Sequence, residues 1–179
     1  MSVVQTVVVA IWLMLPTYVP NNAAVVLGGG TPVDFGREWR GDRILGDGKT
    51  WRGGAAGVGA GFALAVLLNA AAAQGYVPDF LPTFELRAAF ALALGAILGD
   101  MGASFLKRRT GRERGAPFPG VDQLDFVVGA FVVTAVLAPG WFFENFTAGV
   151  VVAVFVLTPV LHVTTNLIAY RLGLKDEPW

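Results

Sequence analysis

The sequence predicts an all-α integral membrane protein, with five transmembrane helices and two long cytoplasmic loops that together form its functional site. Hydrophobic residues make up 55% of the 179 residues, and charged residues only 15%, compared with about 25% in soluble domains. The charges also cluster between long apolar stretches, each long enough to cross a bilayer. We therefore expect a single transmembrane domain over residues 1–179, which leaves no room for a separate soluble catalytic domain.

The composition excludes several kinds of chemistry. The chain has no cysteine, which excludes disulfides, thiolate catalysis and cysteine-bound metals. Its formal net charge is zero and its isoelectric point is about 6.6, so nothing indicates nucleic acid as a partner.

The first predicted span covers residues 3–19 and ends at Pro20-Asn21-Asn22. No charged segment precedes it and no small-residue cleavage site follows it. We therefore interpret it as a retained helix rather than a signal peptide.

The second span, residues 54–73, is rich in glycine and alanine, and Gly53, Gly57 and Gly61 recur at four-residue spacing. Small faces of this kind let helix backbones approach closely in lipid. They suit packing within one chain and between two chains equally, so the oligomeric state stays open.

Three further spans complete the set. They cover residues 86–106, 126–143 and 146–170. The fourth begins just after an acidic pair, and the fifth contains Pro159, His162 and Asn166. We interpret His162, the only histidine, as a packing or hydrogen-bonding residue.

Two long polar loops, residues 21–52 and 107–125, lie on the same side of a five-span protein as the C-terminus. Of the 13 basic residues, all but Arg87 fall on that side. They are Arg37, Arg40, Arg43, Lys49, Arg52, Lys107, Arg108, Arg109, Arg112, Arg114, Arg171 and Lys175. The positive-inside rule then predicts that both loops and the C-terminus are cytoplasmic and that the N-terminus is outside.

Asp100 is an ionisable residue within the third span. It shares one helical stripe with Ser104 and with Lys107 or Arg108. Because a charge near membrane depth is costly without a partner, Asp100 is a candidate for a functional site. An ion pair that only holds helices together explains it equally well.

Asp122 and Asp125, in the stretch GVDQLDF, lie three residues apart where the fourth span begins. If this turn is helical, both carboxylates share a face at the positive end of the helix dipole. Ordinary helix capping would account for Asp122 alone. A pair of carboxylates beside phosphate-binding cations is a common way to hold Mg²⁺ next to a nucleotide.

The stretch GDGKTWRGG, residues 46–54, ends like a phosphate-binding P-loop but lacks the spacing and the strand context of one. Its loop is dense in glycine, which frees backbone N–H groups for an anion. Lys49 and Arg52 lie three apart and are placed to meet phosphate oxygens together. Binding to lipid headgroups would explain the cations, but not the glycines.

Both loop motifs resemble those of one enzyme family. The segments NNAA…GGGTPVDFG…GDRILGDGKTWRG and GDMGASFLKRRTGRERGAPFPGVDQLDF resemble the CDP-archaeol synthases, which are archaeal CTP-dependent lipid cytidylyltransferases. The second segment also looks like a shortened phosphatidate cytidylyltransferase signature, without its Lys-Asp and His-Gly-Gly elements and with Gln123 between the acids. The matching residues are Ser104, Lys107, Arg108, Pro119, Gly120, Asp122 and Asp125.

The resemblance implies that CTP and digeranylgeranylglyceryl phosphate react to give CDP-archaeol and pyrophosphate, with Mg²⁺ as cofactor. A lipid phosphate is already an ionised nucleophile, so this reaction needs no Ser-His dyad, and the sequence shows none. It does need charge neutralisation between two anions, which Mg²⁺, Lys and Arg supply in phosphoryl transfer.

On this resemblance we assign roles to the polar residues. Asp122 and Asp125, with Asp100, are expected to hold Mg²⁺, and Lys49 and Arg52 to bind the triphosphate and its departing part. The nucleotide pocket is assigned to Asn22, Gly28, Gly29, Gly30, Asp34, Gly46 and Asp47. The lipid phosphate is assigned to Ser104, Lys107, Arg108 and Arg109, with the prenyl chains in a groove open to the bilayer.

Two other classes of function account less well for the sequence. A CDP-alcohol phosphatidyltransferase would carry a four-acid D-G-x-x-A-R motif, which is missing. A transporter or a lipid- or nucleotide-binding protein would also place polar residues in helices. The sequence shows no inverted repeat, and its polar residues gather on one side of the membrane rather than midway.

Overall fold

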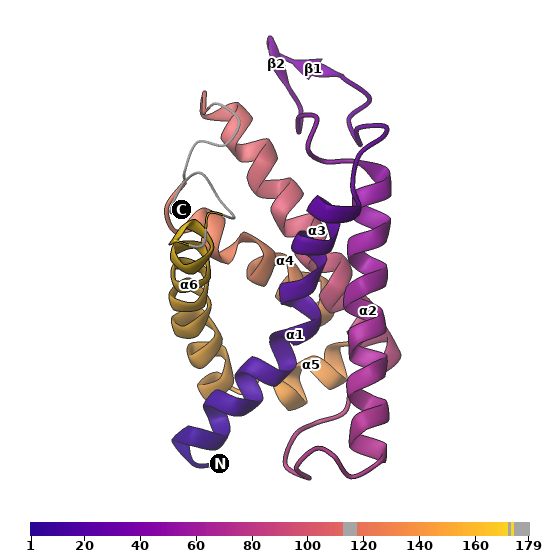
Figure 1. Ribbon diagram of the computed structural model, residues 1–179, viewed down its shortest axis with the longest axis vertical. Helices are drawn as coiled ribbons and strands as arrows, with labels where there is room; N and C mark the ends of the chain where they lie inside the picture. The colour runs from indigo at the N-terminus through magenta and orange to yellow at the C-terminus, as the bar shows by residue number, and fades with distance from the viewer. Residues whose placement is uncertain (113–117, 172, 174–179) are drawn as a thin grey trace.

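A computed structural model describes residues 1–112, 118–171 and 173 (Figure 1). Its helices are α1 (Val3–Leu27), α2 (Trp51–Ala73), α3 (Leu86–Arg109), α4 (Val121–Leu137), α5 (Pro139–Asn145) and α6 (Ala148–Arg171). A short antiparallel ribbon, β1 (Glu38–Trp39) and β2 (Asp42–Arg43), stands at one end of the bundle. Arg114 and Lys175, counted above among the cytoplasmic cations, lie outside the described residues.

Within the described part of the chain, four helices are long and apolar enough to cross a membrane: α1, α2, α3 and α6. The chain is thus an all-helical multi-pass membrane protein. The predicted span 126–143 falls on α4 and α5, which are separated at Ala138. Pro139 begins α5, and a proline disfavours helical backbone in the residue before it.

The predicted end of the first span at residue 19 is wrong, because α1 continues through Pro20 to Leu27. Prolines are tolerated in membrane helices where neighbouring helices pack against the freed backbone. Here α2 does so with its glycine stripe. A Cβ added at Gly57 would lie 2.6 Å from the Pro20 carbonyl oxygen, and one at Gly61 would lie 2.5 Å from that of Pro16. The predicted close approach along this stripe is confirmed.

A second glycine contact joins α3 to α4. A Cβ at Gly99 would collide with the carbonyl oxygen of Asp125, and one at Gly129 would collide with that of Gly95. These glycines let the two backbones touch just where both helices carry acidic residues. The start of α4 is therefore fixed against Gly99, the residue before Asp100.

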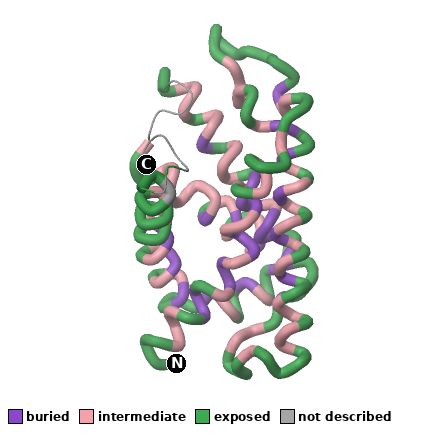
Figure 2. Tube along the Cα trace, in the orientation of Figure 1, coloured by how far each residue is buried: buried purple, intermediate pink, exposed green. Residues whose placement is uncertain are grey.

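The end of the bundle away from the ribbon, at the connection between α2 and α3, is held by indole and amide hydrogen bonds. The Trp12 Nε1–H group donates to the Pro82 carbonyl oxygen and that of Trp141 donates to Thr83, each at 2.9 Å. The side-chain amide of Asn69 both donates to and accepts from the Phe84 backbone, at 2.8 Å each way. Figure 2 shows that buried residues follow the inward faces of the helices, whereas the ribbon and the connections at both ends are largely exposed.

Candidate active site

A cavity of about 480 Å³, called here the polar cavity, opens between α1, α3, α4 and α6. Asp100 on α3 and Asp122 and Asp125 on α4 line it, together with Lys107. The structure thus brings all three acids predicted to hold metal to one space. The other lining residues are Thr17, Tyr18, Asn21, Asn22, Phe126, Thr158, Leu161, His162, Thr165 and Asn166.

Two of these acids are paired with lysines. The Lys49 ammonium group contacts the Asp100 carboxylate, and Lys107 Nζ lies 2.7 Å from Asp122 Oδ1. The other Asp122 oxygen accepts a 2.9 Å hydrogen bond from the Phe118 N–H group, which lies outside helix α4. Asp122 therefore joins the cavity to the preceding loop and does more than cap its own helix.

Asp125 differs from the other two acids. It is half-buried, its Oδ1 accepts the Phe126 N–H at 2.6 Å, and no ion pair reaches it from the described residues. It also lines an adjacent space of about 530 Å³ between α3 and α4, called here the apolar groove. The other groove residues are Leu98, Gly99, Gly102, Ala103, Leu106, Gly120, Val121, Leu124, Val128, Gly129, Val132 and Val133.

The donor set suits a hard cation held jointly with phosphates. Over residues 1–112, 118–171 and 173, no three acidic or histidine side chains form a ready-made metal cage. Mg²⁺ seldom needs one, because it is usually held by one or two carboxylates together with waters and substrate phosphates. Three carboxylates on one cavity, one of which forms no ion pair with a lysine of the described residues, fit that mode.

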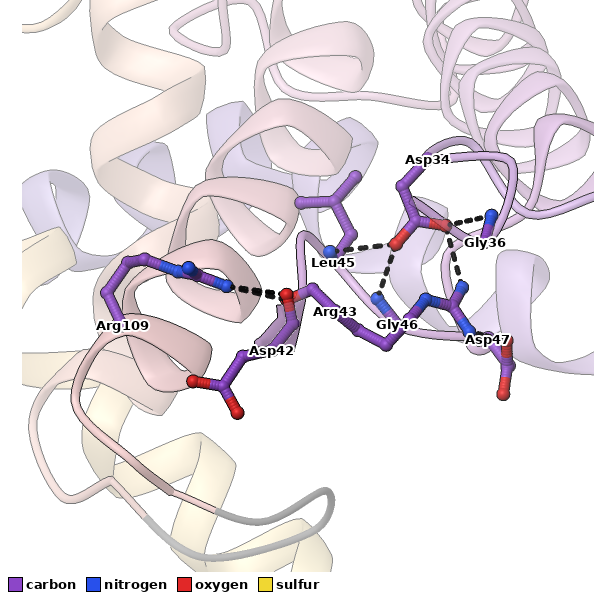
Figure 3. A network of polar contacts seen from close by, with 8 residues as sticks. All are labelled: Asp34, Gly36, Asp42, Arg43, Leu45, Gly46, Asp47 and Arg109. Atoms are coloured by element: carbon purple, nitrogen blue, oxygen red, sulfur yellow. Dashed lines mark hydrogen bonds and ion pairs between the residues drawn. The ribbon is translucent and has the colours of Figure 1, made fainter. Parts of the chain in front are cut away.

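The loop before α2 is organised around the buried carboxylate of Asp34 (Figure 3). This carboxylate accepts hydrogen bonds from the Gly36, Leu45 and Gly46 N–H groups at 3.0–3.1 Å and from the Arg43 guanidinium at 2.7 Å. Burial by itself raises the pKa of Asp34, but Arg43 and the three N–H groups outweigh it and hold the pKa well below its usual range. The Gly46 N–H thus points to Asp34 rather than outward.

Lys49 is placed by the closure of this loop. The Val33 N–H donates to the Lys49 carbonyl oxygen at 2.7 Å, and the Trp51 N–H donates to that of Thr31 at 3.2 Å. Thr50 then caps α2 through a 3.1 Å hydrogen bond from the Gly53 N–H to its hydroxyl. The Lys49 side chain is therefore carried on a fixed backbone toward Asp100.

Arg109 joins the ribbon to α3. Its guanidinium donates to the carbonyl oxygens of Trp39, Asp42 and Arg43, the last two at 3.1 and 2.9 Å, as Figure 3 shows for Asp42. It also lies over the rings of Trp39 and Phe105, 5.3 and 5.5 Å from their centroids. Arg109 was predicted to meet a lipid phosphate, but its two terminal nitrogens are engaged by the protein.

The remaining predicted residues lie around this core. Asn22 is in helix α1 rather than in a loop, lines the polar cavity and donates to the Tyr18 carbonyl oxygen at 3.2 Å. Asp47 is paired with Arg43 at 2.6 Å. Arg52 is exposed, and the described chain offers its guanidinium no ion pair. Gly28 caps α1, Gly29 and Gly30 are exposed with positive φ, and Ser104 and Arg108 are half-buried on α3.

Comparison with known proteins decides the family. A family model described as CarS-like, CDP-archaeol synthase, matches residues 3–179. The chain belongs to this family. A CDP-archaeol synthase of Haloarcula marismortui is 64% identical over 184 residues and covers 100% of both chains. One from Natronomonas pharaonis is 58% identical over 190 residues, covering 99% of this chain and 100% of the relative.

More distant members and a solved structure agree. A CDP-archaeol synthase of Methanosarcina barkeri is 49% identical and covers 93% of this chain and 100% of its own. A solved structure, described as an intramembrane enzyme for archaeal membrane lipid biosynthesis, is 43% identical with a TM-score of 0.70. That similarity covers 88% of this chain and 92% of the other.

In this member of the CDP-archaeol synthase family, sequence reasoning missed the α1 wall of the polar cavity except for Asn22. Thr17, Tyr18 and Asn21 on α1 face it, and Tyr18 Oη lies 2.9 Å from Thr158 Oγ1 on α6. The signal was the four-residue spacing of Thr17 and Asn21, which places both on one helix face. It was hidden because the first span was predicted to end before Asn21.

Proposed function

We propose that this chain transfers the cytidylyl group of CTP to digeranylgeranylglyceryl phosphate, giving CDP-archaeol and pyrophosphate, with the polar cavity as the active site. The observation that carries the proposal is the position of Asp125, which lines both the polar cavity and the apolar groove. A charged nucleotide and a chain-bearing lipid phosphate can meet at such a boundary. The substrates are inferred from the relatives, which are named CDP-archaeol synthases.

In this reaction an oxygen of the lipid phosphate attacks the α-phosphorus of CTP, and the bond to the β-phosphate oxygen breaks. The electron pair leaves with pyrophosphate, and no proton has to be removed from the nucleophile. The protein's main task is to bring two anions together and to stabilise the leaving charge. Lys49 and Lys107 suit that task, because each already reaches a carboxylate that lines the cavity.

Asp125, Asp122 and Asp100 are proposed to hold Mg²⁺ together with CTP phosphate oxygens. When bound, the ion would neutralise phosphate charge and favour departure of pyrophosphate. Asp125 is the leading ligand because, among the residues that the structure describes, no lysine forms an ion pair with it. Lys49 and Lys107 would then release Asp100 and Asp122 and bind phosphate oxygens instead.

The other assigned residues divide into two groups. Arg52 and Arg108 are proposed to meet phosphates directly, with Ser104 beside them. Gly28 to Gly30 and Asn22 are proposed to border the nucleotide. Asp34, Gly46, Asp47 and Arg109 are proposed to act indirectly, because their hydrogen bonds shape the loop that carries Lys49.

We also propose a fifth membrane crossing and an orientation. The 17 residues of α4 rise about 25 Å, slightly less than the roughly 30 Å bilayer core, and α5 extends the path. The ribbon, which contains Arg40 and Arg43, and the C-terminal end of α3, which contains Lys107, Arg108 and Arg109, lie together at the end of the bundle opposite the N-terminus (Figure 1). The positive-inside rule then favours a cytoplasmic ribbon and an external N-terminus.

The test is turnover by purified protein in lipid nanodiscs, with radiolabelled CTP, Mg²⁺ and a prenylated glycerol phosphate. A labelled CDP-lipid and pyrophosphate are expected in equal amounts. Asp125→Asn should lower turnover at least about a hundredfold, as expected for loss of an essential charge, while the thermal midpoint stays close to wild type. Asp79→Asn, an exposed acid in the opposite loop, is the matched control. Substantial turnover by Asp125→Asn would remove it from the metal site.

A further inference from the structure

We propose that Asn21, assisted by Thr17, recognises the nucleoside part of the nucleotide by accepting a hydrogen bond from one of its N–H or O–H groups. This inference rests on the proposed function and adds a residue that recognises the ribose or the base, beyond those proposed to border the nucleotide. It assigns to α1 a role in choosing the nucleotide, whereas α3 and α4 carry the acids.

Two buried side-chain oxygens on α1 lack hydrogen-bond partners within the described chain. They are Asn21 Oδ1 and Thr17 Oγ1, and both are shielded from solvent. Both residues line the polar cavity, one helical turn apart. Most buried polar atoms in native proteins are paired, and leaving one unpaired costs free energy. A ligand in the cavity is the natural source of the missing partner.

The chemistry of the unpaired Asn21 oxygen limits which groups of a ligand can be its partner. An amide oxygen can only accept a hydrogen bond, so its partner must be a donor. Ionised phosphates and ether-linked prenyl chains offer acceptors or no polar groups. The ribose hydroxyls and the exocyclic amino group of cytosine are donors. Of the substrates proposed here, the nucleoside therefore supplies what Asn21 lacks.

The position of Asn21 agrees with a nucleoside beside a triphosphate. Besides the polar cavity, Asn21 lines a small cavity of about 40 Å³ whose wall includes Lys49 and Asp100. It thus lies next to the lysine assigned to the phosphates. A nucleotide with its phosphates at Lys49 would bring its sugar and base close to α1.

The wall that carries Asn21 is held in place before any ligand binds. Tyr18, between Thr17 and Asn21 in sequence, hydrogen-bonds Thr158 of α6 at 2.9 Å. Its ring meets that of Phe126 on α4 edge-on, with centroids 5.9 Å apart. These contacts tie α1 to α6 and α4, and a fixed acceptor discriminates between ligands better than a mobile one.

The experiment compares nucleotides within each variant. For wild type and Asn21→Leu, kcat/KM is measured with CTP, UTP and 2′-deoxy-CTP in nanodiscs. We expect Asn21→Leu to lower either the CTP/UTP ratio or the CTP/deoxy-CTP ratio about tenfold, as expected for one lost hydrogen bond. A fall in the first ratio identifies the cytosine amino group as the donor, and a fall in the second identifies the ribose hydroxyl.

Two further variants and one control complete the comparison. Asn21→Asp keeps an acceptor oxygen and should retain the affected ratio, even if its added charge slows all three nucleotides. Thr17→Val should lower the same ratio by a smaller factor. Thr134→Val is the matched control, because Thr134 Oγ1 on α4 is also buried and unpartnered within the described chain but does not line the cavity. It should leave both ratios unchanged.

If Asn21→Leu loses turnover, thermal stabilisation by CTP, UTP and deoxy-CTP gives the same comparison from binding. Unchanged ratios in Asn21→Leu would overturn the inference, and a changed Mg²⁺ requirement alongside them would place Asn21 at the metal. If wild type fails to turn over any nucleotide, the proposed function fails instead. The two failures are therefore distinguishable.

Discussion

At Arg109, one guanidinium group holds three backbone carbonyl groups of the ribbon and lies against two aromatic rings. A planar group with several donors in a fixed geometry can do this, whereas a lysine ammonium acts as a single point charge. Because the ribbon leads into the loop that carries Lys49, Arg109 is a positioning residue for the proposed triphosphate site. Its charge matters less than its shape.

Replacing Arg109 by Lys should therefore loosen the ribbon although the charge is kept. Hydrogen bonds from charged donors contribute about 1.5–3 kcal/mol each, so hydrogen-exchange protection of residues 38–46 should fall on the order of tenfold or more. The KM for CTP should rise because Lys49 is less well placed. Arg37→Lys, on an exposed residue of the same loop, should change neither quantity. Unaltered exchange in Arg109→Lys would contradict the positioning role.

At the scale of elements, the contact between α3 and α4 places the acids. Gly99 of α3 touches the Asp125 backbone, and Gly129 of α4 lies against Gly95. Only glycine allows this distance, since any side chain would push the helices apart. The carboxylates of Asp100 and Asp125 face one cavity because the two backbones are in contact beside them.

Gly99→Ala should thus impair activity more than the small size of the added methyl group suggests. The added methyl group collides with the carbonyl oxygen of Asp125, and overpacking of this kind typically costs about 1–3 kcal/mol. We expect a lower thermal midpoint in detergent and a reduced apparent affinity for Mg²⁺. Gly59→Ala on α2 is the control, because a Cβ there meets nothing within 4 Å. Equal behaviour of the two variants would mean that helix spacing does not govern the site.

The elements also show what the sequence could and could not predict. Close packing along the stripe of Gly53, Gly57 and Gly61 could be predicted, because these glycines recur at a regular spacing within one span. The end of α1 could not be predicted, because Pro20 stops a helix in water but is accommodated here against the α2 backbone. The same tertiary contact kept Asn21 in the helix and in the cavity wall.

Similar limits apply to the site. The convergence of Asp100, Asp122 and Asp125 was predictable, since charges in apolar surroundings point to partners or ligands. The inward roles of Asp34 and Arg109 were not, because loop hydrogen bonds depend on a ribbon that local sequence does not specify. In the sequence, a charged residue in or near a glycine-rich loop looks the same whether it binds a substrate or the backbone of the loop.

The orientation of the whole protein in the membrane can be tested by labelling. The chain has no cysteine, so single cysteines report on exposure without background. In intact cells of an expression host, a membrane-impermeant maleimide should label Ser2→Cys and Tyr76→Cys. It should label Glu38→Cys only after permeabilisation. All three positions are exposed, so a difference reflects sidedness. Labelling of Glu38→Cys alone in intact cells would reverse the orientation.

The shared wall at Asp125 has a consequence for traffic through the enzyme. One product of the proposed reaction, CDP-archaeol, is amphiphilic, and the other, pyrophosphate, is a small, highly charged anion. Both would form at the same site. The apolar groove would offer the lipid product a path into the bilayer, while the polar cavity would offer pyrophosphate a separate path to water. Synthesis and delivery of the lipid would then be a single event, with no need for the new headgroup to leave the membrane surface.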